Sequence, residues 1–133
     1  MVEIRRKILV AMRHEGVVAA ERALGGYVEI VPSYTFEDAV RRLETQEIRL
    51  ILCGMYFAET RMFDLLRFVK ERFPSRPFIA CRVGQSEVPQ VTLEAVAIAA
   101  KSMGAVEFVD IPLLRPDPVA DQEFRSLVLR HLR

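Results

Sequence analysis

Residues 48–55 read Ile48-Arg-Leu-Ile-Leu-Cys-Gly-Met55, and this stretch decides the class of fold. A strand with one face in water alternates apolar and polar residues, whereas a near-continuous apolar run is typical of a parallel strand with helices on both faces. We therefore expect residues 48–55 to form the central strand of a parallel sheet.

The sequence on either side of this run alternates between short apolar runs and helical patterns. Further strands are expected at residues 8–12, 27–31, 77–83 and 105–111, and helices at residues 17–24, 35–43, 62–73, 93–103 and 117–132. Thr35 with Asp38 resembles a capping box, and Asp117-Pro118 supply an N-cap and a first-turn proline. Alternating strands and helices predict an α/β fold: a doubly wound five-stranded parallel sheet in the flavodoxin-like order 2-1-3-4-5, with helices on both faces.

The composition fits one such domain. The chain has 133 residues and a mass of 15.2 kDa, and 51% of its residues are hydrophobic, so we expect residues 1–133 to form a single domain with a packed core. Its 19 basic and 18 acidic residues give a net charge of +1, which argues against a dedicated nucleic-acid-binding protein. No apolar run approaches the roughly 20 residues that cross a membrane, and no signal peptide is evident, so the expected compartment is the cytoplasm.

Beyond the order of its elements, the sequence resembles the response-regulator receiver domain family. The resemblance extends from Lys7 to about Leu132 and rests on the spacing of its matched stretches. These are Leu50-Ile-Leu-Cys-Gly54, Phe63-Asp-Leu-Leu66, Phe73-Pro-Ser-Arg-Pro-Phe-Ile-Ala-Cys81, Leu93-Glu-Ala-Val96, Gly104-Ala105 and Val109-Asp-Ile-Pro112. It implies the receiver fold and a role in two-component signal transduction.

The same resemblance implies that the phosphorylation pocket is degenerate. Met12 and Arg13 stand where the family has the acidic pair that holds Mg²⁺, and Gly54 (Cys53 if the register slips by one) stands in place of the phosphoacceptor Asp. Arg82 replaces the hydroxyl residue after the fourth strand, and Ile111 replaces the Lys after the fifth. Phosphoryl transfer needs a carboxylate acceptor and oxygen ligands for the metal. We therefore expect a pseudo-receiver with no metal, no cofactor and no enzymatic activity, which acts through protein–protein interaction.

The face formed by the fourth helix, fifth strand and fifth helix is the usual partner surface of receivers, and we expect it to serve here. Homodimerisation through it is a further expectation, because Val128, Leu129 and Leu132 give the last helix more apolar surface than one core-facing stripe needs. Phe108 aligns with the aromatic switch position of receivers and is expected to be held in one rotamer by packing. The surface is expected to comprise Lys101, Phe108, Arg115, Phe124, Val128, Leu129 and Leu132.

Arg13 and Arg82 are also compatible with a second function, the binding of a small anion. Two guanidiniums at the strand ends would favour phosphate, sulfate or a carboxylate, and the chain would then be a sensor that binds a small anionic ligand in the vacated pocket. Alternatively, one guanidinium fills this pocket and pairs with Asp110, or both are solvated surface residues.

Two further features have alternative interpretations. Cys53 and Cys81 lie on strands expected to be neighbours, and at equal level and equal facing their Cα atoms would lie about 5 Å apart, close to disulfide range. They would then form a redox switch, whereas the alternative is two structural core cysteines. The apolar loop Met55-Tyr-Phe57 either folds back over the empty pocket, which we expect, or forms a patch for a partner.

Overall fold

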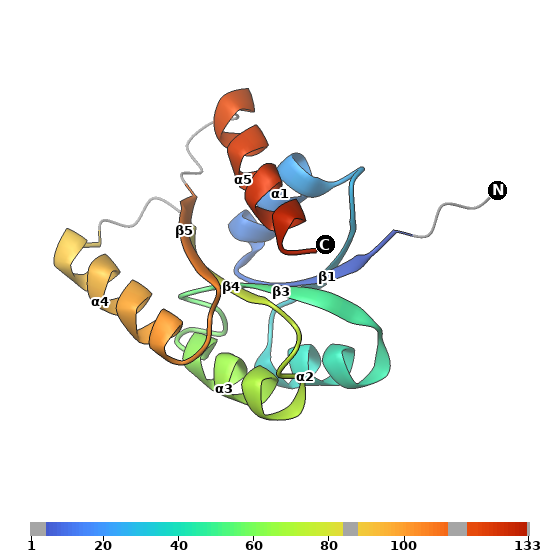
Figure 1. Cartoon of the computed structure of the whole chain (residues 1–133), viewed down its shortest axis with the longest axis horizontal. Helices are drawn as coiled ribbons and strands as arrows, with labels where there is room; N and C mark the ends of the chain where they lie inside the picture. Colours follow the sequence, from blue (N-terminus) through green and yellow to red (C-terminus); the bar gives the residue numbers. More distant parts are fainter. Residues whose placement is uncertain (1–4, 84–87, 112–116, 133) are drawn as a thin grey trace.

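The computed structural model describes residues 5–83, 88–111 and 117–132, and in this part of the chain strands and helices alternate from end to end (Figure 1). The strands are β1 (Lys7–Ala11), β2 (Glu29–Ser33), β3 (Ile48–Gly54), β4 (Phe78–Val83) and β5 (Glu107–Ile111). The helices are α1 (His14–Leu24), α2 (Phe36–Thr45), α3 (Met62–Arg72), α4 (Gln90–Ser102) and α5 (Pro118–Arg130).

All five strands are parallel and lie in the order β2-β1-β3-β4-β5, which confirms the predicted topology. β3 is the central strand, and all of its residues except Arg49 are buried. Helices α1 and α5 cover one face of the sheet, while α2, α3 and α4 lie on the other (Figure 1). The continuous apolar run of β3 follows from this arrangement, because both of its faces pack against helices.

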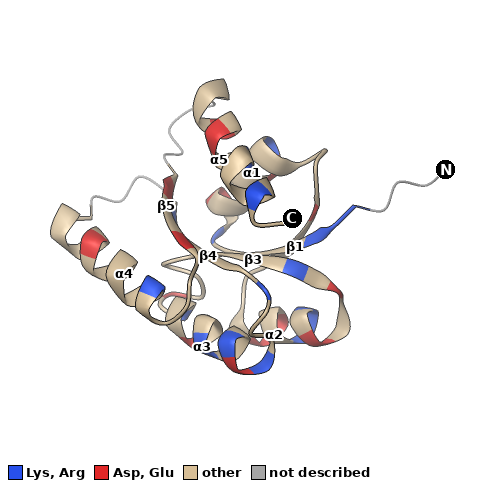
Figure 2. Ribbon diagram, viewed as in Figure 1, with Lys and Arg blue, Asp and Glu red and all other residues tan. Residues whose placement is uncertain are grey.

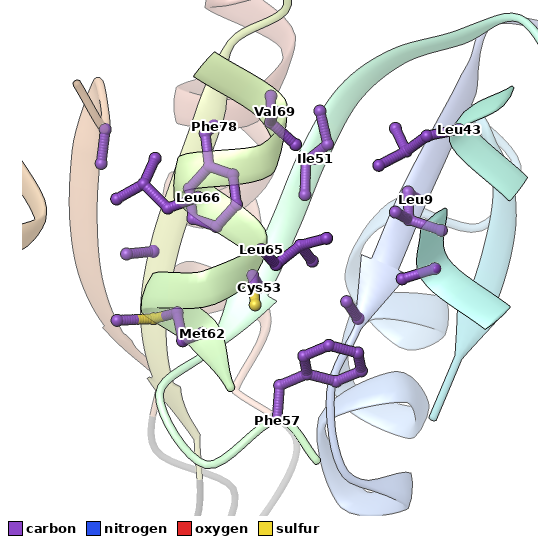
Figure 3. Packing of buried hydrophobic residues seen from close by; sticks show 14 of the residues in the cluster. Leu9, Leu43, Ile51, Cys53, Phe57, Met62, Leu65, Leu66, Val69 and Phe78 are labelled. Carbon is purple, nitrogen blue, oxygen red and sulfur yellow. The ribbon is translucent and has the colours of Figure 1, made fainter. Parts of the chain in front are cut away.

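Each face of the sheet carries its own hydrophobic core. On the face covered by α2 and α3, Leu9, Ile51 and Phe78 pack against Leu65 and the buried ring of Phe57 (Figure 3). The other core, under α1 and α5, is built from the alternate strand residues and from apolar residues of these two helices. Successive strand residues point to opposite faces, so each strand supplies both cores.

The expected helix caps are present. The Thr35 hydroxyl oxygen accepts the backbone N–H of Asp38 at 3.1 Å, and the Asp117 carboxylate accepts the N–H groups of Val119 and Ala120 at 3.1 and 3.3 Å. Asp38 instead accepts a hydrogen bond from the Ser33 hydroxyl at 2.9 Å, which ties the start of α2 to the end of β2.

The second strand differs from its predicted bounds of 27–31. It spans Glu29–Ser33 and includes Pro32, which was expected to end it. β2 is an edge strand that pairs only with β1 in the sheet order, so a proline that lacks an N–H is tolerated there. Helix α4 also begins earlier than expected, at Gln90 directly after Pro89.

Candidate functional site

The site that the sequence predicted lies at the carboxyl edge of the sheet, and Met12 occupies its centre. Met12 directly follows β1, and its side chain is 2% exposed. A Cβ added to Gly54, the last residue of β3, would lie 3.5 Å from Met12 Cγ, and one added to Gly16 in α1 would lie 2.6 Å from Met12 Sδ. The thioether therefore fills the space between the end of β3 and the first turn of α1.

Little empty space remains between Met12, Gly16 and Gly54. The cavity that Met12 lines together with Gly16, Gly54, Tyr56 and Val83 has a volume of about 10 Å³. Such a volume holds no more than about one water molecule. An open hollow of about 370 Å³ adjoins Met12 on the side of Arg13, Tyr34 and Glu59, so the methionine side chain fills the space between β3 and α1 but not the whole edge.

Arg82 lies across the edge of the sheet from this cavity and is paired with Asp110. The two residues are cross-strand neighbours in β4 and β5, and Arg82 Nη1 lies 3.1 and 3.4 Å from the two carboxylate oxygens of Asp110. The Arg82 side chain is 16% exposed, so this ion pair is partly shielded from water. This pair matches one part of the alternative given above, in which a guanidinium pairs with Asp110. The other part, that the guanidinium also fills the vacated pocket, is not observed, because Met12 lies there.

Arg13 lies apart from this pair. Its side chain is exposed and its Nε is 4.0 Å from the carboxylate of Glu15. β3 lies between β1 and β4, so the strands that carry Arg13 and Arg82 are about 10 Å apart. Within the described part of the chain, Arg13 lines the cavity beside Met12 and a shallower hollow with Tyr34, and Arg82 lines neither.

The residues at the carboxyl edge do not fit the Mg²⁺ ion that the receiver fold implies. Mg²⁺ prefers hard oxygen ligands, whereas Met12 offers a thioether, Arg13 a cation and Gly54 no side chain. Of the nearby acids, Asp110 is paired with Arg82, while Glu15 lies 4.0 Å from Arg13 and Glu59 lines the open hollow beside Met12 and Arg13. Over residues 5–83, 88–111 and 117–132, no three His, Cys, Asp or Glu residues are grouped so that they could hold a metal ion.

The two cysteines lie on opposite faces of the sheet, so the equal level and facing that a disulfide would require are absent, and both are core residues. The register of β3 and β4 pairs Cys53 with Ala80 and Gly54 with Cys81. An offset of one residue turns a side chain to the other face, and each thiol accordingly belongs to a different core. Burial raises the pKa of both thiols, which keeps them protonated and unreactive.

The loop after β3 packs inward, as expected, through Phe57. This ring is fully buried in the core beneath α3, and Met55 and Tyr56 are half-buried (Figure 3). Ala58 and Glu59 follow with positive φ angles of 47° and 70°. The sequence contains no Gly or Asn there to signal a left-handed turn, so sequence reasoning missed this strained segment.

The expected partner surface on α5 needs correction. Phe124, Val128 and Leu132 are buried in the core, and Leu129 packs against the same core. The reason is that α5 packs on α1 as well as on the sheet. An Arg22–Asp121 ion pair of 2.9 Å and a hydrogen bond from Arg125 to the carbonyl of Ala23 join the two helices.

The remaining residues of that expected surface lie in different environments. Lys101 is exposed in the last turn of α4, whereas Phe108 is half-buried against the core on the same side of the sheet. Arg115 lies outside the described residues.

An exposed apolar face of α4 was not predicted. Val91 and Ile98 are 71% and 68% exposed, and Ala95 between them is exposed on the same face of the helix. Val106, just before β5, is 38% exposed. The spacing of residues 91, 95 and 98 signals this face, but the expected helix began only at residue 93.

Comparisons with known proteins identify the fold. No protein-family model and no curated protein matches the sequence. A response regulator from Thermotoga maritima has 16% sequence identity and a TM-score of 0.75, and the match covers 97% of this chain and 98% of that one. A putative response regulator from Chloroflexus aurantiacus has 16% identity, a TM-score of 0.74 and 98% coverage of both chains.

An orphan response regulator of H. pylori is similar to the same extent, with 12% identity, a TM-score of 0.73 and coverage of 96% of this chain and 97% of that one. At such low identity these likenesses show the fold alone. The chain has the fold of response-regulator receiver domains, as the sequence resemblance predicted. None of the helices in the described part of the chain has the length and hydropathy to cross a lipid bilayer.

Proposed function

We propose that this chain is a pseudo-receiver, a single-domain signalling module that does not accept a phosphoryl group and acts by binding proteins. The observation that carries the proposal is the position of Met12. Its thioether packs against Gly16 and Gly54, in the space where a receiver would need a metal ion and an acceptor carboxylate.

The chemistry of this edge supports the absence of phosphoryl transfer. The step requires a nucleophilic oxygen and a cation that neutralises the charge on the transferred group. Gly54 has no side chain to attack, and Met12 and Arg13 provide no ligand for a cation. Asp110 is engaged by Arg82, and neither Glu15 nor Glu59 stands at the acceptor position, which Gly54 occupies.

The Arg82–Asp110 pair supports a single, constitutive conformation. It links the ends of β4 and β5 through two contacts of 3.1 and 3.4 Å to one guanidinium nitrogen. Phe108, in the same strand as Asp110, packs against the core beneath α3 and α4. These contacts need no bound group, and the module would therefore present the same surface to a partner at all times.

The exposed apolar face of α4 is the surface that we assign to protein binding. Val91, Ala95 and Ile98 lie on one side of the helix, and Val106 precedes the neighbouring strand β5. Large apolar side chains gathered on a surface mark sites of protein contact. The partner is a second copy of the chain or another signalling protein, and Lys101 lies at the end of the same helix.

Sedimentation velocity over a range of concentrations tests this surface. The unmodified chain is expected to self-associate, and Ile98→Glu is expected to abolish the association because a carboxylate would be buried in the contact. Val18→Glu is the matched control, because Val18 is 51% exposed on α1, in the other helical layer. Association that survives Ile98→Glu, or that Val18→Glu abolishes equally, would contradict the assignment of the α4 face.

The alternative function, a sensor that binds a small anion through Arg13 and Arg82, remains a prediction. Arg82 is engaged with Asp110 and lines neither cavity beside Arg13, so no observation favours a shared ligand. A thermal-shift screen of phosphorylated metabolites tests it. Stabilisation that disappears in an Arg13→Ala, Arg82→Ala double variant would favour the sensor over the pseudo-receiver.

A further inference from the structure

A separate cavity opens at the amino edge of the sheet, the end opposite to Met12 and Gly54. Its volume is about 360 Å³, which falls within the range of small-molecule sites. It is enclosed by the residues that enter β3, the loop that precedes β4 and the end of α5. The lining residues are Glu47, Ile48, Arg49, Ser75, Arg76, Pro77, His131 and Leu132.

Arg76 is the most firmly held cation of this cavity. Its guanidinium lies over the ring of Phe73, 4.2 Å from the centroid, and its Nη1 donates to the carbonyl of Leu43 at 3.4 Å. Lys70 in turn donates to the backbone carbonyl of Arg76 at 3.3 Å. A guanidinium fixed by a ring and a carbonyl loses little further entropy when it binds a ligand.

Arg49 supplies a second cation to the lining of the cavity. Its side chain is 53% exposed, and its guanidinium lies 3.7 Å from the carboxylate of Glu47, which makes a surface pair. Such pairs stabilise a protein by about 0–1 kcal/mol, so Arg49 can readily turn to a ligand. Basic residues also gather at the starts of β1 and β3 (Figure 2), and Arg6 donates a hydrogen bond to the carbonyl of Leu132.

The two guanidiniums of the cavity affect each other electrostatically. Burial lowers the pKa of Arg76, the carboxylate of Glu47 opposes this, and the positive charge of Arg49 lowers it further. Arg49 and Arg76 thus line one cavity together with Glu47, and their like charges disfavour each other. His131 does not add to this pair, because its Nε2 lies 3.3 Å from Glu107. An anion placed between Arg49 and Arg76 would relieve their repulsion.

We propose that the cavity between Arg49 and Arg76 binds a small phosphate-bearing ligand. Guanidiniums bind phosphate oxygens in a bidentate manner, and the Ser75 hydroxyl is a further donor at the rim. Ile48, Pro77 and Leu132 form an apolar wall, and the volume leaves room for an organic group attached to the phosphate. This site shares no residue with the carboxyl edge or with the α4 face, so it is independent of the function proposed above.

Titration with pyrophosphate, followed by the backbone amide signals in NMR spectra at constant ionic strength, tests the site. Saturable shifts are expected for amides of residues 47–49 and 75–77, and chloride at equal ionic strength is expected to cause none. Arg49→Gln is expected to weaken pyrophosphate binding about tenfold, because one charge-assisted contact is lost. Glu47→Gln is expected to tighten binding about threefold, since it removes the competing carboxylate.

Arg67→Gln is the matched control, because Arg67 is an exposed arginine of α3 that does not line this cavity. It is expected to leave pyrophosphate affinity unchanged. Shifts that do not saturate, or that chloride reproduces, would overturn the proposal. Equal affinities of the Arg49→Gln variant and the unmodified chain would overturn it as well, as would weaker binding by Glu47→Gln.

Discussion

Replacing Gly16 by alanine tests whether the Met12 side chain occupies the space at the carboxyl edge. In an exposed helix this change stabilises a protein by about 1 kcal/mol, because alanine has the higher helix propensity. In α1, however, the new Cβ would lie 2.6 Å from Met12 Sδ and 3.0 Å from Met12 Cβ. The cavity of about 10 Å³ beside Gly16 and Gly54 is too small to receive the displaced thioether, which would have to leave its packed position toward the open hollow at Arg13 and Tyr34.

The expected magnitude follows from these two opposing effects. Overpacking in a filled core costs about 1–3 kcal/mol, so Gly16→Ala is expected to lower the free energy of unfolding by about 0–2 kcal/mol after the gain in propensity. In a Met12→Ala background the 2.6 Å contact with Sδ is gone and only the 3.0 Å contact with the Cβ of residue 12 remains, so the same substitution is expected to be less destabilising, or to stabilise the protein by up to about 1 kcal/mol. The double-mutant cycle therefore predicts a coupling of up to about 3 kcal/mol between residues 12 and 16.

Urea unfolding measured by far-UV circular dichroism gives these free energies, since the chain contains no tryptophan for fluorescence. Gly54→Ala is the control. Its Cβ would make an ordinary contact of 3.5 Å with Met12 Cγ, so its effect is expected to stay within about 0.5 kcal/mol. If Gly16→Ala stabilises the protein equally with Met12 and with Ala at position 12, the side chain of Met12 does not fill this space.

Three further predictions concern other parts of the molecule. Burial raises the pKa of the Cys53 and Cys81 thiols, so they stay protonated in the folded chain, whereas thiols of the unfolded chain ionise near pH 9.0. The free energy of unfolding is therefore expected to fall above that pH, by up to about 1.4 kcal/mol per pH unit for each thiol. Urea unfolding at pH 8 to 10 checks this, and an equal slope in a Cys53→Ala, Cys81→Ala variant would refute it. Arg82→Gln and Asp110→Asn are each expected to lower the free energy of unfolding by about 1 kcal/mol. In the double variant the two effects are expected to be coupled by about 0.5–1 kcal/mol, and fully additive effects would disprove the ion pair. Thr35→Ala is expected to lower the free energy of unfolding by about 1 kcal/mol, because the hydroxyl that caps α2 is lost, whereas Thr35→Ser is expected to keep most of this stability. Equal losses of stability for the two variants in thermal or urea unfolding would exclude a capping role.

The strands and helices could be predicted because apolar runs and helix caps are local features of the sequence, and the sheet order followed from their alternation and the preference for right-handed crossovers. Residues 48–55 have the composition of a doubly covered strand, and Asp117 with Pro118 is a local signal for a helix start. Features that depend on how elements meet in space could not be predicted. The register of β3 against β4, which separates Cys53 from Cys81, depends on where the two strands begin relative to each other.

The candidate site shows the same division. That Met12 and Gly54 lack carboxylates follows from the sequence and the receiver resemblance, but the packing of Met12 against Gly16 depends on the position of α1. Val128 was assigned to the surface because the contact between α5 and α1 is not visible along the chain. The left-handed conformation of Glu59 carries no local signal either, since no Gly or Asn stands at this position.

Intact-mass spectrometry after incubation with acetyl phosphate and Mg²⁺ tests the central claim most directly. The mass of the chain is expected to remain unchanged, because the acceptor position at the carboxyl edge carries no carboxylate and the residues of the acidic pair offer no oxygen ligands for the ion. A receiver domain with an intact acidic pocket, treated in the same way, serves as the positive control. An acid-labile gain of one phosphoryl group on this chain would contradict the claim and indicate a functional phosphorylation site.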